Sequence, residues 1–281
     1  MQNRFSGIKV DEISKLIKEI NISESHETYR ILMGFLDLTS LNQTDSEKSV
    51  KDMVARVNNF PFLFPDLLNV AGICVFPRFV PAVKETLEIK DVKIVSVAGS
   101  FPASQTFIEN KIDECKRVMD AGAEEIDIVI SLGEFLSGNK GLVGDEIRAI
   151  KEIIGCTHLK VILETGVIES PDLIYSASML AMEAGADFIK TSTGKAPVSA
   201  RPEAAWVMCH AIKDFYNSSE KEVGFKPAGG ISTKNDALIY YSIVEAVLGK
   251  TWLVPGLFRI GASRLANDLL NAIEGREANY F

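Results

Sequence analysis

The sequence is poor in the residues that build metal centres and disulfide frameworks. Its 281 residues include three histidines and four cysteines. The histidines are scattered and no two cysteines form a CxxC pair, which argues against a zinc site and against a disulfide scaffold. We therefore expect no bound metal, and we interpret the four cysteines as buried, reduced thiols: Cys74, Cys115, Cys156 and Cys209.

A surplus of basic residues and long hydrophobic runs are also lacking. Thirty lysines and arginines stand against 38 acidic residues, a formal net charge of −8, whereas nucleic-acid-binding proteins carry clustered basic charge. The sequence has no run of about 20 apolar residues and no signal-peptide pattern. We expect a cytoplasmic protein that binds neither nucleic acid nor membrane. A local site for an anionic small molecule is compatible with this overall charge.

Short apolar runs alternate with amphipathic segments along most of the chain. The runs are mainly continuous, which is typical of parallel strands covered by helices. Eight such runs without a Ser/Pro/Gly-rich linker predict an α/β protein, a (β/α)8 TIM barrel in one domain over 1–281, with 1–25 as an N-terminal helical extension. The expected strands are 31–38, 72–76, 93–98, 125–130, 160–164, 188–191, 223–228 and 258–261, and the expected helices are 46–58, 106–121, 145–154, 171–184, 202–216, 234–248 and 263–274.

An open, doubly wound sheet is the alternative architecture. It normally carries a glycine-rich fingerprint after its first strand, and no such fingerprint follows Leu38. The barrel is therefore favoured.

Four ionisable residues interrupt the apolar runs of the fourth to seventh expected strands. They are Asp127 in EIDIVI, Lys160 in LKVILETG, Lys190 in GADFIKTSTGK and Lys226 in VGFKPAGG. One such charge is explained equally well as a rim residue with a partner, but four on consecutive strands converge on one mouth of the barrel. Burial and mutual repulsion then lower the pKa of at least one lysine. A neutral lysine in a pocket with little water can form a Schiff base with a carbonyl substrate.

Small and hydroxyl-bearing residues follow the sixth, seventh and eighth expected strands, at 191–195, 228–232 and 261–263. Loops at these places commonly bind phosphate in barrels, through backbone N–H groups and a helix N-terminus. The alternative is ordinary turn chemistry, with Ser263 as a helix N-cap. Three adjacent loops of this kind favour a phosphate site.

These motifs, together with GICVFPRF at 72–79 and FRIGAS at 258–263, resemble the deoxyribose-phosphate aldolase family of class I aldolases. The resemblance extends from about Leu36 to about Leu270. It implies a (β/α)8 barrel that acts in deoxyribose phosphate catabolism. The implied reaction is the reversible, Schiff-base cleavage of 2-deoxy-D-ribose 5-phosphate to acetaldehyde and D-glyceraldehyde 3-phosphate. It also implies no metal or organic cofactor, because the protonated imine is the electron sink, and a homo-oligomer, with a dimer favoured.

The resemblance also implies roles for individual residues. Lys190 matches the Schiff-base nucleophile, Lys226 the lysine that lowers its pKa, Asp127 the proton-relay carboxylate, and Lys160 a further lysine near the relay. The expected substrate-binding residues are Asp37, Thr39 and Asn42, which line the mouth at the first strand, Cys74 on the second strand, and Thr193, Gly194, Lys195, Gly229, Gly230, Ser232, Gly261 and Ser263 in the loops after the last three strands.

Two positions depart from the family pattern. Ser232 stands where many members carry an arginine, and Arg264 either replaces that arginine or points into solvent. Tyr280 is next to last in the chain, whereas bacterial members often end in a mobile tyrosine that helps proton transfer, and its role stays open. Two other functions also stay open: another class I barrel aldolase or transaldolase, and a non-catalytic barrel that binds sugar phosphates.

Overall fold

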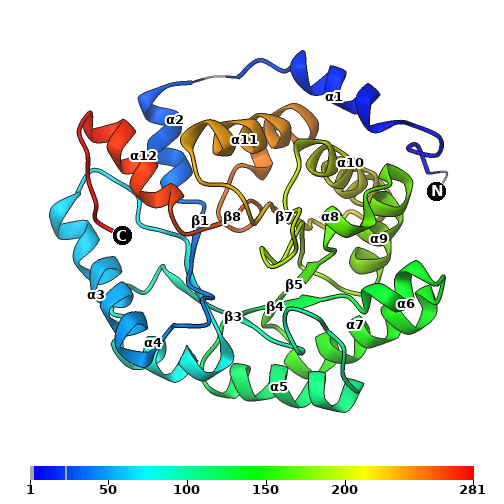
Figure 1. The fold of residues 1–281 in the computed structure, drawn as a ribbon, viewed down its shortest axis with the longest axis horizontal. Helices are drawn as coiled ribbons and strands as arrows, with labels where there is room; N and C mark the ends of the chain where they lie inside the picture. The colour runs from blue at the N-terminus through cyan, green and yellow to red at the C-terminus, as the bar shows by residue number, and fades with distance from the viewer. Residues whose placement is uncertain (1–2, 23) are drawn as a thin grey trace.

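The computed structural model describes residues 3–22 and 24–281, and these residues contain eight parallel strands that form one sheet (Figure 1). The strand order is β7-β6-β5-β4-β3-β2-β1-β8. Parallel bridges from Phe225 to Phe258 and from Ala228 to Gly261 bring the two end strands together. The predicted (β/α)8 barrel is therefore confirmed. The strands are β1 (Leu36–Thr39), β2 (Gly72–Val75), β3 (Lys93–Val97), β4 (Glu125–Val129), β5 (His158–Ile162), β6 (Phe188–Lys190), β7 (Gly224–Lys226) and β8 (Ile260–Ala262).

Helices surround the strands in Figure 1 and connect each strand to the next. Short α4 follows β2, and α6 and α8 are single short helices at the ends of β4 and β5, none of which the hydrophobic periodicity indicated. The helices are α1 (Val10–Lys18), α2 (His26–Met33), α3 (Glu47–Leu63), α4 (Val80–Thr86), α5 (Ile108–Asp120), α6 (Leu132–Leu136), α7 (Lys140–Ile154), α8 (Thr165–Ile168), α9 (Pro171–Glu183), α10 (Pro202–Ser219), α11 (Lys234–Leu248) and α12 (Leu265–Glu274), with 3-10 turns η1 (Pro77–Phe79) and η2 (Lys250–Trp252).

The predicted start of the first strand, at residue 31, is wrong. Residues 31–33 form the last turn of α2, and β1 begins only at Leu36. Ser25 accepts a hydrogen bond from the backbone N–H of Thr28 and so starts this helix as its N-cap. Continuous apolar residues such as Leu32 and Met33 are buried in a helix as readily as in a strand, which is why the pattern misled.

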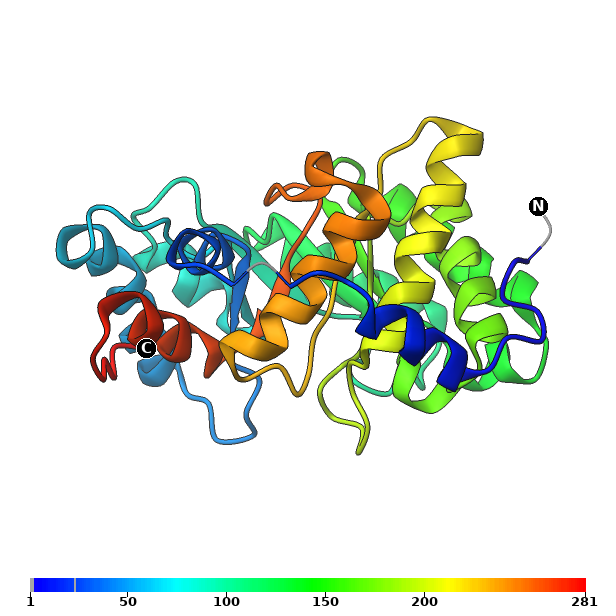
Figure 2. The ribbon, with the colours of Figure 1, turned by 90° about the horizontal axis from the view of Figure 1, so that it is seen from above.

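The predicted N-terminal extension packs on the outside of the barrel (Figure 2). Ser14 of α1 donates a hydrogen bond to Glu203 of α10 at 2.5 Å. Nearer the N-terminus, Arg4 pairs with Asp214 at 2.9 Å and Phe5 is buried. The extension therefore covers the barrel's outer helices and leaves its mouth open. Among the described helices, none is long and apolar enough to cross a membrane.

Two kinds of side chain, apolar and charged, fill the interior of the barrel. On the side of β2 and β3, a small apolar cluster of Leu41, Cys74, Val95 and Val97 occupies it. Most other apolar core residues, such as Val161 and Ile189, belong to a separate, larger cluster. On the side of β4 to β8, charged side chains fill the space instead.

Candidate active site

The four charges predicted to converge do so on Asp127. The Nζ atoms of Lys190, Lys226 and Lys160 lie 2.7, 2.8 and 3.1 Å from its carboxylate oxygens. The strand register explains this meeting, because Asp127 pairs with Lys160 across β4 and β5, and Lys190 pairs with Lys226 across β6 and β7. All four side chains are buried. The alternative interpretation, a charged residue at the rim with a partner, therefore applies to none of these four residues.

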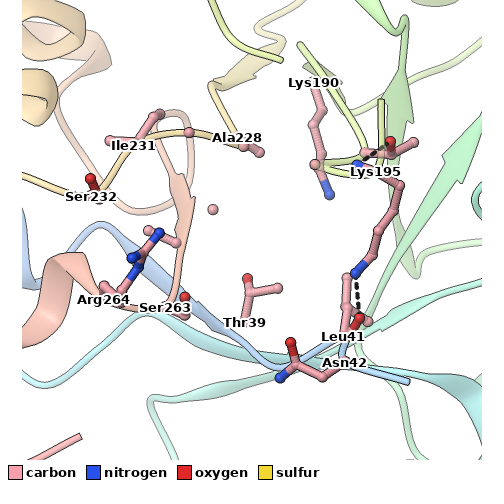
Figure 3. Close-up of a pocket in the computed structure, with 16 residues that line it drawn as sticks. Thr39, Leu41, Asn42, Lys190, Lys195, Ala228, Ile231, Ser232, Ser263 and Arg264 are labelled. Carbon is pink, nitrogen blue, oxygen red and sulfur yellow. Dashed lines mark hydrogen bonds between the residues drawn. The ribbon is translucent and has the colours of Figure 1, made fainter. Parts of the chain in front are cut away.

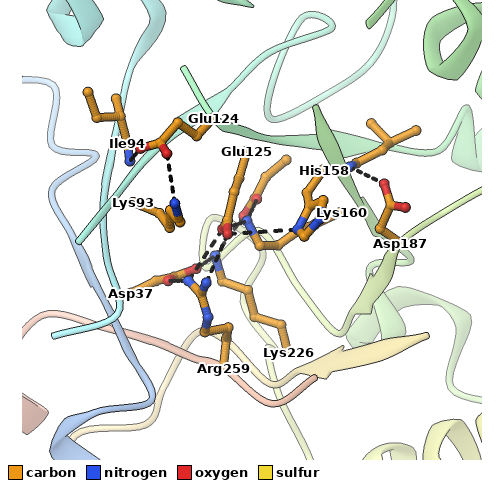
Figure 4. A network of polar contacts seen from close by, with 12 residues as sticks. Asp37, Lys93, Ile94, Glu124, Glu125, His158, Lys160, Asp187, Lys226 and Arg259 are labelled. Carbon is orange, nitrogen blue, oxygen red and sulfur yellow. Dashed lines mark hydrogen bonds and ion pairs between the residues drawn. The ribbon is translucent and has the colours of Figure 1, made fainter. Parts of the chain in front are cut away.

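Three further charges complete the cluster, and Figure 4 shows them together with Lys160 and Lys226. Arg259 contacts Asp37 at 2.5 Å and Glu125 at 2.8 Å. Lys160 contacts Glu125 at 2.5 Å, and Lys226 forms an ion pair with Asp37. Sequence reasoning missed Glu125 and Arg259. The spacing of two residues between Glu125 and Asp127 was the available signal, because it puts both side chains on one face of a strand.

Asp37 is therefore not where the family pattern suggested. It was expected at the mouth, but it is fully buried beneath it. Thr39, two residues further along β1, lines the mouth cavity instead. The alternation of a strand puts both side chains on the same face, with Asp37 about 7 Å deeper. Cys74 is also buried inside the barrel, as a member of the small apolar cluster, and does not line the mouth cavity.

The charges of the cluster move the pKa values of its members in opposite directions. Burial lowers the pKa of Lys190, and the nearby Lys226 lowers it further, against the opposing effect of Asp127. Burial also acts against the charged form of Lys226, but the two carboxylates of Asp127 and Asp37 prevail and raise its pKa. Burial disfavours ionised Asp127, yet three lysines hold its pKa well below the usual value. Lys190 is thus the lysine whose ammonium is destabilised, as the sequence predicted for at least one lysine.

A cavity of about 190 Å³ opens above the cluster (Figure 3). Lys190 and Lys195 lie on one side of it, Ser232 and Arg264 on the other, and Thr39 and Asn42 below in this view. Lys190 is the member of the charged cluster that lines it, whereas Asp127, Lys160 and Lys226 lie outside the lining. The predicted substrate-binding residues that line it are Thr39, Asn42, Thr193, Gly194, Lys195, Gly229, Gly230, Ser232, Gly261 and Ser263.

Glycines in the loops after β6 and β7 form part of the wall of this cavity. Gly194, Gly229 and Gly230 have φ values of 75°, 82° and 81°, a region that side-chain-bearing residues rarely adopt. A Cβ atom on Gly229 would lie 2.9 Å from the Cα of Gly194 and 2.7 Å from the Cβ of Ser199. The loops after β6 and β7 thus approach each other closely at Gly194 and Gly229, and both glycines line the cavity.

Several polar groups at the mouth already form hydrogen bonds within the protein. Lys195 donates a hydrogen bond to the backbone carbonyl of Leu41 at 2.5 Å, and the Thr193 hydroxyl donates to Glu164 at 2.6 Å. The backbone N–H of Ser232 donates to Asp236 at 3.1 Å, at the start of α11. These contacts hold the loops after β5, β6 and β7 in place.

Ser263 and Arg264 precede the first turn of α12, and both line the cavity. The N-cap of α12 is Arg264, and no side chain caps this helix end. The alternative interpretation of Ser263 as an N-cap is therefore wrong. Arg264 does not point away from the site, which was the second possibility for this residue, since it lies beside Ser232 on the cavity wall (Figure 3).

Tyr280 lies away from this cavity. Its hydroxyl donates a hydrogen bond to the carbonyl of Arg56 at 2.6 Å, and its ring packs against Phe60 and Phe64. Asn267 accepts hydrogen bonds from the N–H groups of Tyr280 and Phe281.

Within residues 3–22 and 24–281, no group of three or more His, Cys, Asp or Glu side chains is placed to hold a metal ion.

Comparison with known proteins bears on this arrangement. The family model for DeoC/LacD family aldolases matches residues 31–263. Deoxyribose-phosphate aldolase of Homo sapiens is 39% identical over 262 residues, covering 88% of this chain and 82% of the human one. The same enzyme of Agrobacterium fabrum is 35% identical over 259 residues, covering 92% and 96%. The tetrameric deoxyribose phosphate aldolase of Aeropyrum pernix, 23% identical, has the same fold, with a TM-score of 0.67 over 94% of this chain and 98% of that one.

Proposed function

The chain belongs to the DeoC/LacD aldolase family, and from this premise we propose that it reversibly cleaves 2-deoxy-D-ribose 5-phosphate to acetaldehyde and D-glyceraldehyde 3-phosphate. Its relatives named above are deoxyribose-phosphate aldolases, so the chain is an enzyme of the lyase class. One observation carries the proposed chemistry. Of the three lysines that share Asp127, Lys190 lines the cavity, where a substrate carbonyl can reach it.

In the first half of the reaction, Lys190 is the nucleophile. Its neutral amine attacks C1 of the open-chain sugar, and loss of water gives an iminium. Removal of the C3 hydroxyl proton then turns the electron pair of the C2–C3 bond towards the iminium. The bond breaks, D-glyceraldehyde 3-phosphate leaves, and an enamine remains on Lys190.

In the second half, the enamine is protonated at C2 and the resulting iminium is hydrolysed to acetaldehyde. Asp127 is the proton-relay group, because it contacts Lys190 directly, and Lys226 and Lys160 hold its carboxylate in place by hydrogen bonds. The iminium itself withdraws the electrons, so the reaction we propose uses no metal or organic cofactor.

The phosphate is proposed to bind at the opposite wall of the cavity. Backbone N–H groups near Gly229, Gly230 and Gly261 and the hydroxyl of Ser263 are the neutral donors there, and Arg264 supplies charge. The start of α12 adds a favourable helix dipole. Thr39 and Asn42 are proposed to contact the sugar between the two ends.

Oligomeric state and cellular compartment stay predictions: a homo-oligomer, with a dimer favoured, in the cytoplasm. The Aeropyrum pernix relative is described as tetrameric.

Borohydride trapping tests the function directly. The chain is incubated with 2-deoxyribose 5-phosphate, the iminium is reduced, and the modified peptide is identified by mass spectrometry, while acetaldehyde release is followed in a coupled assay. We expect the adduct on Lys190, with Lys190→Ala abolishing both adduct and turnover. Lys116→Ala, at an exposed helical lysine, is the matched control and should change neither.

Different outcomes identify the alternatives. An adduct on Lys160 or Lys226 would overturn the assignment of the nucleophile. Turnover of other phosphorylated sugars without acetaldehyde would indicate another class I aldolase or a transaldolase. Binding without any turnover would indicate a non-catalytic sugar-phosphate-binding barrel.

A further inference from the structure

The charged cluster contains a closed ring of ion pairs that does not include Lys190. Around it, carboxylates and cations alternate without a break: Asp127, Lys226, Asp37, Arg259, Glu125, Lys160 and back to Asp127. We call this set of six residues the ion-pair ring. Lys190 is attached to the ring at one point, through its 2.7 Å contact with Asp127.

Counting charges within the ring separates Lys190 from the other cations. Three ionised carboxylates balance three protonated cations, so the ring is neutral when complete. Each of its members is at most 4% exposed, and an unbalanced charge in such a place is costly. A protonated Lys190 is therefore the fourth cation facing three carboxylates that are already balanced.

We propose that Arg259 and Glu125, which lie outside the cavity lining, are positioning residues that set the charge around Lys190 by completing the ion-pair ring: the Arg259 cation favours the neutral amine of Lys190, and the Glu125 carboxylate balances that cation. This inference rests on the proposed function only in taking Lys190 as the nucleophile. Arg259 is suited to the part because a guanidinium does not release its proton. Its guanidinium nitrogens contact Asp37 and Glu125 and so join both carboxylates into the ring.

The effect passes to Lys190 through the neighbouring pairs. Asp37 contacts Lys226 and Glu125 contacts Lys160, so Asp127 already faces two cations that belong to the ring before Lys190 is counted. The raised pKa of Arg259, whose two carboxylates outweigh its burial, agrees with this assignment. The charged and titratable groups that face Lys190 or share its cavity from the packed elements are Asp127 of β4, Lys226 of β7, Cys74 of β2, Lys195 after β6 and Arg264 before α12.

The test measures the pKa of Lys190 without any substrate. Acetic anhydride acetylates only the neutral amine, so the pH dependence of Lys190 labelling, quantified by mass spectrometry and normalised to exposed Lys116, reports that pKa. Arg259→Met leaves the ring with a surplus negative charge and should raise the pKa by about one unit, a tenfold loss of neutral amine. Glu125→Gln leaves a surplus positive charge and should lower it by a similar amount.

Two controls separate charge from structure. Arg259→Lys keeps the charge and disturbs the geometry, so it should leave the pKa of Lys190 nearly unchanged. The double variant Glu125→Gln/Arg259→Met is neutral again and should return the pKa towards the wild-type value. A purely structural role predicts losses of stability without opposite shifts in pKa.

Each outcome either supports or contradicts the proposed role of Arg259 and Glu125. Shifts of opposite sign support the inference, and if Arg259→Met does not fold, the downward shift in the nearly isosteric Glu125→Gln is required on its own. No shift, or shifts of the same sign, would overturn it. Acetaldehyde release from the wild-type chain is measured in parallel, so a chain that fails to cleave deoxyribose phosphate but shows the opposite shifts refutes the proposed function alone.

Discussion

The floor and the mouth of the candidate site are built on different principles. The floor is the ion-pair ring with Lys190, made of buried charged side chains that start from strands or, for Arg259, from the residue before β8. The mouth is made of loop backbone, hydroxyls and glycines, with Arg264 and Lys195 at its edge. Charge at Lys190, the proposed nucleophile, thus depends on buried side chains of the barrel, whereas the proposed anion site depends on how closely loops approach. The two regions should respond differently to substitution.

The largest effect is expected where the floor is broken. Asp127→Asn leaves three buried lysines facing an uncharged partner and should lower the free energy of unfolding by about 3 to 5 kcal/mol. Urea denaturation at pH 7 measures it. Asp145→Asn, at an exposed carboxylate paired with Arg148, is the matched control and should change stability by no more than about 0.5 kcal/mol.

The pH dependence of that loss has a definite sign. The pKa of Asp127 is lowered on folding, because the lysines outweigh its burial, so its contribution to stability is complete above its ordinary value of 3.8 and declines as the pH falls below it. The difference between wild type and Asp127→Asn should therefore narrow below about pH 3.8. A difference that is constant with pH would show that the charge of Asp127 is not what stabilises the floor.

An intermediate effect is expected from Lys226→Leu, which keeps the floor packed but removes a cation next to Lys190. The pKa of Lys190 should rise, and kcat/KM at neutral pH should fall on the order of a hundredfold, as two pKa units imply. Much of the loss should be recovered at alkaline pH. A uniform loss with an unshifted pH profile would instead give Lys226 a direct chemical part in the reaction.

The smallest effect is expected at the mouth, where we propose that several neutral donors share the phosphate. Arg264→Ala should reduce the preference for 2-deoxyribose 5-phosphate over 2-deoxyribose by about tenfold, the value of one charge-assisted hydrogen bond. The ratio of kcat/KM for the two sugars measures it. Ser232→Arg should increase the same ratio by adding a second guanidinium. If Arg264→Ala leaves the ratio unchanged, the arginine does not hold the phosphate and the mouth relies on neutral donors alone.

The sequence predicted the upper part of the floor better than the lower part. Charged residues inside apolar strands are conspicuous, so Asp127, Lys190 and Lys226 could be found by periodicity. Glu125 begins its strand and Arg259 precedes one, and residues at such places usually face solvent. Only the closure of the barrel, which brings the segment before β8 across to β4, shows that these two meet. Long-range pairing of this kind leaves no local signal in a single sequence.

The mouth was predicted in outline for a different reason. Glycines and hydroxyls after the last three strands indicated its loops, and Arg264 stayed ambiguous because a helix start can turn its side chain either way. The first strand was partly misread because α2 ends in apolar residues that continue without interruption towards β1. In both cases the residue types indicated which segments matter. They did not show which way the Arg264 side chain points, or where α2 ends and β1 begins.

The backbone contact between Gly194 and Gly229 has a consequence for redesign of the substrate range. The two loops approach each other closely, and a Cβ on Gly229 would lie 2.7 Å from the side chain of Ser199 and 2.9 Å from the Cα of Gly194. Gly229 therefore has no room for a side chain, and the positive φ of Gly194 and Gly230 makes a side chain unfavourable there as well. Room for larger or uncharged acceptor aldehydes has to come from the opposite wall, where Thr39, Leu41 and Asn42 present replaceable side chains to the cavity. A library built on those three positions should yield altered specificity, while one built on the glycines should mostly yield chains with displaced loops.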